Sequence, residues 1–310
     1  MQNSAIRALV TAGRGPVIAA AFFERTVQIW ESYAATRLAE FDTVFDSGGH
    51  RLAISPKATV CVAASWRKGK RGGVACYDTR SGQVVWHRID LGRVQGLRFT
   101  PAGDSLWCRV EGGPVLHLDA STGATLSSLR AVQDVIESPF SAHRLERRRG
   151  DFRIVGDKTV RVAHTTFGLL DAAFGTDAVC LTEAGGPVRC LDCGAGNERW
   201  RYQPPAGHHV LTISHQADGC FYGVQWEYEH GSSMKLIRLA PESGHMTEIC
   251  NLKTSPDAFS FGAGELITSS GDVISLTEGT ILRHLDFPQR EYPDRPPTLD
   301  EILVDLRSKP

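Results

Sequence analysis

The sequence predicts an all-β fold, a seven-bladed β-propeller of four-stranded antiparallel blades, and three observations support this. A hairpin pattern with a polar, glycine-containing turn returns at intervals of roughly 33 to 48 residues, the period of propeller blades. A second pair of short alternating strands precedes most of these hairpins, as in segments 50–65, 94–110 and 208–224. Helical periodicity is nearly absent before residue 298, which argues against an α/β fold.

The clearest hairpin is residues 73–88, GVACYDTRSGQVVWHR, in which each turn residue has a mechanical role. Asp78 can accept hydrogen bonds from the turn backbone, and Ser81 can assist it. Gly82 supplies the positive φ that a short antiparallel connection requires, and Trp86 follows in the next strand. The same pattern returns at two later hairpins, in Asp119, Thr122 and Gly123 and in Asp192, Gly196 and Trp200.

Four less regular hairpins complete the ring. Three centre on Gly156, Gly244 and Gly279, and a degenerate first copy spans residues 26–41. The segment 132–147, in the fourth blade, follows the pattern least well. Residues 4–10 are expected to form the innermost strand of the first blade and residues 281–286 to complete the last. The propeller should therefore span residues 1–287 and close without an N-terminal strand added to the last blade.

The motif D-x-x-[ST]-G-x-x-x-W in these hairpins resembles that of quinoprotein-like propellers, which share their blade architecture with WD-repeat propellers. The resemblance covers residues 4–287 and implies structural roles for the motif: the turn, and a tryptophan that packs between neighbouring blades. Ser127 replaces the tryptophan in the third blade, and blades six and seven lack the aspartate. Nothing matches a quinone site, so the resemblance implies the fold and no cofactor.

Composition and charge limit the classes of function. Of 310 residues, 42% are hydrophobic and 22% charged, and the formal net charge is −1, so no global field attracts nucleic acid or an anionic membrane. The N-terminus lacks secretory features, and the apolar run 17–23 is too short to span a bilayer. The eight cysteines lie mostly in strand-like runs. We therefore expect a reduced, cytoplasmic location.

Three charged segments are candidates for partner binding, because loops between second and third strands should share one face of a propeller with the connections between blades. They are SWRKGKRGG, HRLERRRGD and WEYEHGSS, in blades two, four and six. Aromatic residues and arginine carry much of the energy of protein interfaces, although long hairpin loops are also charged simply because they are solvated. The candidate residues are Trp66, Arg67, Lys68, Lys70, Arg71, Arg144, Arg147, Arg148, Arg149, Trp226, Glu227, Tyr228, Glu229 and His230.

Two other classes of function stay open. The basic loops could neutralise phosphates of a nucleic acid, although the neutral overall charge argues against it. Alternatively, the propeller could be a lactonase- or lyase-like enzyme with a site at the central channel, where Asp134, Asp171 and Asp257 begin or flank innermost strands. No catalytic cluster with recognisable spacing is visible, so no catalytic residue is assigned.

Cysteine and histidine patterns do not predict a metal site. Cys190 and Cys193 form a single C-x-x-C without a second half, and their place at the end of a predicted strand favours a structural role. His208 and His209 are adjacent, and neighbouring side chains in a strand point to opposite faces. We therefore assign no metal ligand.

Residues 288–310 form a proline-rich linker followed by a predicted amphipathic helix. Thr298 and Glu301 make a capping box, and leucine and isoleucine line one face of the helix. A helix this short needs a packing surface, on the propeller or in a partner's groove. The leading interpretation is a non-enzymatic module that binds another protein through its loop face, as a scaffold or an immunity-type inhibitor.

Overall fold

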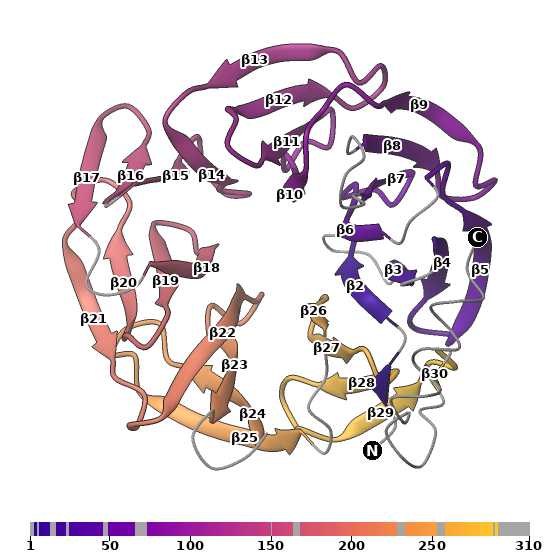
Figure 1. The fold of residues 1–310 in the computed structure, drawn as a ribbon. Helices are drawn as coiled ribbons and strands as arrows, with labels where there is room; N and C mark the ends of the chain where they lie inside the picture. Colours follow the sequence, from indigo (N-terminus) through magenta and orange to yellow (C-terminus); the bar gives the residue numbers. More distant parts are fainter. Residues whose placement is uncertain are drawn as a thin grey trace, which may run out of the picture.

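The computed structural model describes residues 3–4, 6–12, 17–22, 25–45, 49–65, 73–149, 151–163, 168–227, 233–252, 258–287 and 289–290. Their strands form seven four-stranded antiparallel sheets around a central channel, and one two-stranded sheet (Figure 1). In each four-stranded sheet the strands lie in chain order, with the first innermost and the fourth on the perimeter. The predicted all-β propeller of four-stranded antiparallel blades is confirmed.

The blades are numbered in chain order. Blade one contains β2 (Ile6–Thr11), β3 (Val17–Phe22), β4 (Thr26–Glu31) and β5 (Thr36–Asp42). Blade two contains β6 (Gly49–Ile54), β7 (Val60–Ser65), β8 (Gly73–Asp78) and β9 (Val84–Arg88). Blade three contains β10 (Val94–Phe99), β11 (Ser105–Val110), β12 (Val115–Asp119) and β13 (Thr125–Leu129). Blade four contains β14 (Val132–Glu137), β15 (Arg144–Arg148), β16 (Asp151–Val155) and β17 (Thr159–Ala163).

The second half of the ring follows the same order. Blade five contains β18 (Leu169–Phe174), β19 (Ala178–Glu183), β20 (Val188–Asp192) and β21 (Glu198–Tyr202). Blade six contains β22 (His208–His215), β23 (Phe221–Glu227), β24 (Met234–Leu239) and β25 (Met246–Leu252). Blade seven contains the shorter strands β26 (Phe259–Phe261), β27 (Glu265–Thr268), β28 (Asp272–Ser275) and β29 (Ile281–His284).

A tryptophan on one blade packs on the turn glycine of the next. Trp86 in blade two donates a hydrogen bond from Nε1 to the carbonyl of Ala120 in blade three (2.8 Å). Gly123 has a φ of 70°, and a Cβ there would lie 2.6 Å from the Trp86 ring. Only glycine therefore satisfies both the turn and the contact.

The same contact recurs with other side chains. Trp200 donates to the carbonyl of Pro241 (2.6 Å), and its ring lies where a Cβ of Gly244 would be. Where the tryptophan is missing, an outer-strand side chain of the preceding blade takes its place: Phe41 against Gly82, Val160 against Gly196, and Ile249 against Gly279. The predicted packing of tryptophan between blades is confirmed.

The predicted aspartate turns also form. Asp78 accepts hydrogen bonds at Oδ1 from the Arg80 and Ser81 amides and from the Ser81 hydroxyl. Asp119 does the same with the amides and hydroxyls of Ser121 and Thr122. These bonds, the Ser121 hydroxyl first, lower the pKa of Asp119. Asp192 likewise accepts from the amides of Gly194 and Ala195.

The ring closes between blades one and seven, each built from its own four consecutive strands, as predicted. Thr11 Oγ1 donates to the carbonyl of Phe261, joining the innermost strands (2.5 Å). Trp30 packs edge to face on Phe287 at 5.5 Å between ring centroids. Outside the blades, β1 (Asn3–Ser4) pairs with β30 (Gln289–Arg290), which the sequence analysis did not anticipate (Figure 1). The predicted C-terminal helix lies outside the described residues.

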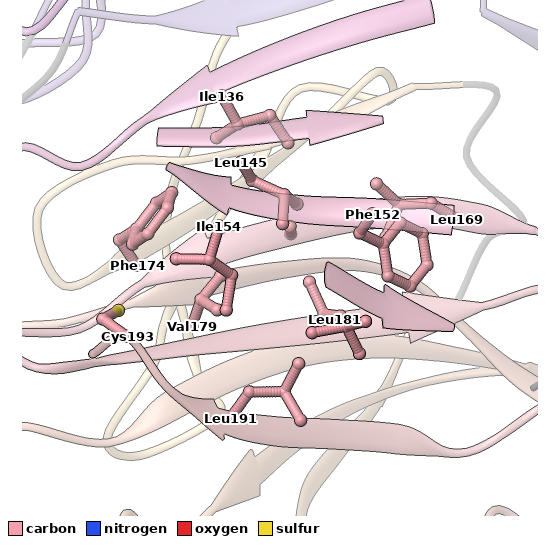
Figure 2. Close-up of a cluster of buried hydrophobic side chains, with 12 residues drawn as sticks. Ile136, Leu145, Phe152, Ile154, Leu169, Phe174, Val179, Leu181, Leu191 and Cys193 are labelled. Atoms are coloured by element: carbon pink, nitrogen blue, oxygen red, sulfur yellow. The ribbon is translucent and has the colours of Figure 1, made fainter. Parts of the chain in front are cut away.

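Apolar side chains fill the spaces between adjacent blades. In one such cluster, Leu145, Phe152 and Ile154 of blade four pack against Leu181 and Leu191 of blade five (Figure 2). The side chains alternate along each strand, so both faces of a blade are buried. Within the described part of the chain, no helix is long and apolar enough to cross a bilayer.

Replacing Trp86 with alanine should lower the free energy of unfolding by about 3–5 kcal/mol, because a buried ring and its contact with Gly123 are lost. Trp86→Phe should cost about 1–3 kcal/mol, since the carbonyl of Ala120 loses its donor. Urea denaturation measures both. The neighbouring exposed residue gives the control, Val85→Ala, which should stay within about 0.5 kcal/mol of wild type. Equal effects at the two positions would contradict the interblade role.

Acid should destabilise the turn of blade three that contains Asp119. Because its folded pKa is lowered, its stabilising contribution is complete above the unfolded value of about 3.9 and disappears as the pH falls through the folded pKa. Asp119→Asn keeps hydrogen-bond acceptors but removes the titration. The melting temperature of this variant should therefore fall less than that of wild type between about pH 5 and pH 3. Asp157→Asn, at an exposed turn, is the control; an unchanged slope in Asp119→Asn would refute this assignment.

Candidate functional site

The ring has two faces, which differ in the connections they carry. The connection face carries the links between blades and the loops between second and third strands. The hairpin face carries the first-to-second and third-to-fourth turns. Each of the three predicted segments spans the junction between a second and a third strand, and the strand ends at these junctions lie at the connection face. The side chains of Trp66, Arg67, Lys68, Lys70, Arg71, Tyr228, Glu229 and His230 lie outside the described residues.

The prediction of a long basic loop in blade four is wrong. Arg144, Arg147 and Arg148 lie in β15, and only residues 149–150 separate it from β16. Arg144 pairs with Glu137 at the hairpin-face end of the strand, so it does not belong to the connection face. Arg144, Glu146 and Arg148 are spaced two residues apart along β15, so their side chains lie on the same side of the blade.

Glu146 is the buried centre of an ion triad in blade four. Its side chain is 5% exposed, and its two carboxylate oxygens lie 2.9 Å from Arg144 Nη2 and 2.9 Å from Arg148 Nη2. Burial by itself would raise the pKa of Glu146, but the hydrogen bonds from Arg148 and Arg144 outweigh it and lower the pKa. Arg144 and Arg148 are thus engaged within the blade.

Glu146→Gln should lower the free energy of unfolding by about 1–3 kcal/mol, because two guanidinium groups lose the charged acceptor that they share. Urea denaturation at neutral pH measures the loss. Glu242→Gln, at an exposed turn of blade six, changes the same charge and should have little effect. If both variants unfold like wild type, the triad does not stabilise blade four.

Trp226 and Glu227 also lie in a strand, at the end of β23, and not in a loop. Trp226 packs against the cluster between blades six and seven, and its ring lies 5.1 Å from that of His209. Glu227 accepts a hydrogen bond from Ser233 Oγ (2.6 Å) and lies 4.0 Å from Nε2 of His208. The adjacent histidines thus start β22 with different neighbours, as alternation along a strand requires.

The innermost strands of blades one to six share a β-bulge near the connection face. A bulge leaves one residue unpaired and bends the strand, so the residue that follows takes an equivalent place around the channel in each blade. In these six blades, the identity of this one residue therefore determines which chemical group lies at this level of the channel. The six residues are Ala8, Arg51, Gly96, Asp134, Asp171 and Thr212.

The channel holds a cavity of about 890 Å³ lined by innermost strands of all seven blades. Arg98 of blade three reaches Asp171 of blade five, with Nη2 3.8 Å from Oδ1. The Asp171 carboxylate also accepts hydrogen bonds from the Ala172 amide (2.9 Å), Thr212 Oγ1 (2.6 Å) and the Ile213 amide (3.1 Å). Asp171 is therefore held rigidly between blades five and six.

Two of the three aspartates that the sequence analysis proposed for inspection lie on innermost strands. Asp171 is described above, and Asp134 in β14 accepts a hydrogen bond from the Val135 amide (2.9 Å). Asp257 lies outside the described residues.

Arginines from blades two to four gather at the connection-face mouth of the channel. Arg51 Nε donates to the carbonyl of Gln95 (2.7 Å), and Arg109 Nη1 lies 3.8 Å from Asp134 Oδ2. The sequence analysis did not single out Arg51, Arg98 or Arg109. A signal existed: in blades one to five, the innermost strand starts with two residues followed by a variable one and an apolar one, as in GHRL, VQGL and VQDV.

Cys190 and Cys193 have separate structural surroundings. Both are buried, Cys190 in the cluster between blades five and six and Cys193 in the cluster between blades four and five. Burial raises the pKa of Cys193 to about 12. Among the described residues there is no group of three or more histidine, cysteine, aspartate or glutamate side chains that could hold a metal ion.

Comparisons with known proteins identify the type of propeller. No family model matches the sequence, and no curated protein matches it. Among solved structures, the chain is similar to the RRP9 WD40 repeats, with a TM-score of 0.69 and 11% identity over 86% of this chain and 88% of that one. The fold is WD40-like.

Two further structures support the same assignment. The structure of U3-55K has a TM-score of 0.68 and 11% identity, covering 86% of this chain and 89% of that one. The β-propeller domain of Cps50 (Swd1) from Myceliophteria thermophila has a TM-score of 0.67 and 11% identity, covering 90% and 95%. WD40-like propellers are typically used to bind proteins, whereas identities this low show the fold alone.

Proposed function

We propose that this protein is a non-enzymatic, cytoplasmic binding module that holds a protein partner on its connection face, as a scaffold or an immunity-type inhibitor. The observation that carries the proposal is the presence of exposed apolar side chains among the charges of this face. Ile89 is 64% exposed, Val44 48% and Leu170 41%. They lie in links between blades or at the start of an innermost strand, on three different parts of the ring.

Charged groups of both signs are exposed on the same face. Arg93 and Glu111 face each other at 3.4 Å with about half of each side chain exposed, and Gln95 also donates to Glu111 (3.0 Å). Arg130 and Arg149 are exposed on the same face. Exposed apolar side chains and charges of both signs are features by which protein interfaces gain affinity and specificity.

A rigid ring also suits this role. Because its two faces are assembled from separate blades, a partner can contact residues far apart in sequence without ordering a flexible segment, which would cost binding free energy.

Charge reversal on the two faces tests the proposal. Arg130→Glu with Arg149→Glu changes the connection face, and Lys57→Glu with Arg80→Glu makes the same change in charge on the hairpin face. In affinity capture from the native source, the connection-face variant should lose at least about tenfold of a bound protein, whereas the hairpin-face variant should retain it. Equal loss, equal retention, or recovery of nucleic acid that disappears at high salt would each refute it.

A further inference from the structure

Arg109 and Arg147 occupy equivalent positions in neighbouring blades at the connection-face mouth of the channel. Arg109 in β11 pairs with Gly96 of the innermost strand, and Arg147 in β15 pairs with Asp134. Gly96 and Asp134 are the residues that follow the bulge in blades three and four. In blades one and two, the residues equivalent to the arginines are the small Ala21 and Ala64.

A glycine lies beside each of the two arginine side chains. A Cβ on Gly96 would lie 3.6 Å from Arg109 Cβ and 3.9 Å from its Nε. A Cβ on Gly168, at the start of blade five, would lie 3.4 Å from Arg147 Nη2. Gly96 therefore leaves space beside the Arg109 side chain.

The positive charge of this pair exceeds the negative charge beside it. Asp134, between the two arginines, lies 3.8 Å from Arg109 Nη1, and Arg147 makes no ion pair among the described residues. The Nε atoms of Arg109 and Arg147 are buried, and neither has a hydrogen-bond partner within the described part of the chain. Two guanidinium groups and one carboxylate leave one net positive charge in a partly buried place, where an uncompensated charge is costly.

We propose that Arg109 and Arg147 bind an oxyanion, a phosphate or a carboxylate group, at the connection-face mouth of the channel. Guanidinium groups present parallel N–H donors that match the two oxygens of such a group. Burial lowers the pKa of Arg147 and the charge of Arg109 lowers it further, whereas Asp134 raises it without cancelling the shift, which agrees with two cations that share a single carboxylate. Burial and then Arg109 lower the pKa of Arg51 in the same way, so the positive potential extends into blade two.

This site is independent of the proposed protein partner, because the group can arrive free or on a larger molecule. The test therefore uses small anions with the intact protein. Inorganic phosphate and acetate are titrated separately, with chloride keeping the ionic strength constant, and the melting temperature is followed. We expect phosphate or acetate to raise the melting temperature in a saturable way that chloride does not reproduce. A response to phosphate alone assigns a phosphoryl group, and a response to acetate at least as strong assigns a carboxylate.

Three variants identify the site. Arg109→Gln removes one guanidinium and should weaken binding of the active anion at least about tenfold. Gly96→Asp keeps every arginine but places a carboxylate beside Arg109, where there is room for it, and should weaken binding by a similar factor. Arg130→Gln removes an exposed arginine from the same face and should bind as wild type.

Gly96→Asp keeps the test decisive if Arg109→Gln fails to fold. Wild-type behaviour of Gly96→Asp would overturn the proposal, as would equal stabilisation of the wild-type protein by phosphate, acetate and chloride. The protein-binding proposal would survive either outcome, because its own variants change Arg130 and Arg149 and leave Arg109 and Arg147 intact.

Discussion

At five of the seven blade junctions, a side chain on the outermost strand of one blade packs on the left-handed turn glycine of the next, and the order of the blades in the ring depends on this contact. Trp86 on Gly123 is its fullest form, with a hydrogen bond to Ala120 as well as ring contact. A positive φ and a close neighbour both exclude a side chain at the glycine. The contact joins each of these blades to the one that follows, and closure of the ring leaves few exposed sheet edges.

Because these contacts lie away from the channel, the residues that line the channel can vary without disturbing them. The contacts that hold the blades together lie on the perimeter and between the sheets, whereas the bulge near the start of the innermost strand in blades one to six places one residue of each of these blades at the channel. At that position, Asp171 accepts a hydrogen bond from Thr212 of blade six, and Gly96 leaves space beside Arg109. The scaffold can therefore carry a specific binding surface without changing what stabilises it.

Local features could be predicted from the sequence, whereas the assignment of charged residues to a strand or a loop could not. The aspartate, glycine and tryptophan hairpins form as predicted because their hydrogen bonds lie within a few residues. The arginines of blade four were assigned to a loop because a run of charges resembles a solvated segment. Glu146, buried between Arg144 and Arg148, makes the strand possible, and its burial depends on neighbouring strands. The pairing of β1 with β30 has no local signal, because each strand has two residues.

By itself, the sequence determined the all-β blades, their order and the residues that shape each outer turn, because strand alternation and turn chemistry are properties of short segments. The tertiary structure alone decided which side chains from different blades meet: Arg98 with Asp171 and Arg109 with Asp134. The physical reason is that these pairs depend on where each strand stands around the closed ring. That position follows from the packing of every blade on the next, which no single repeat contains.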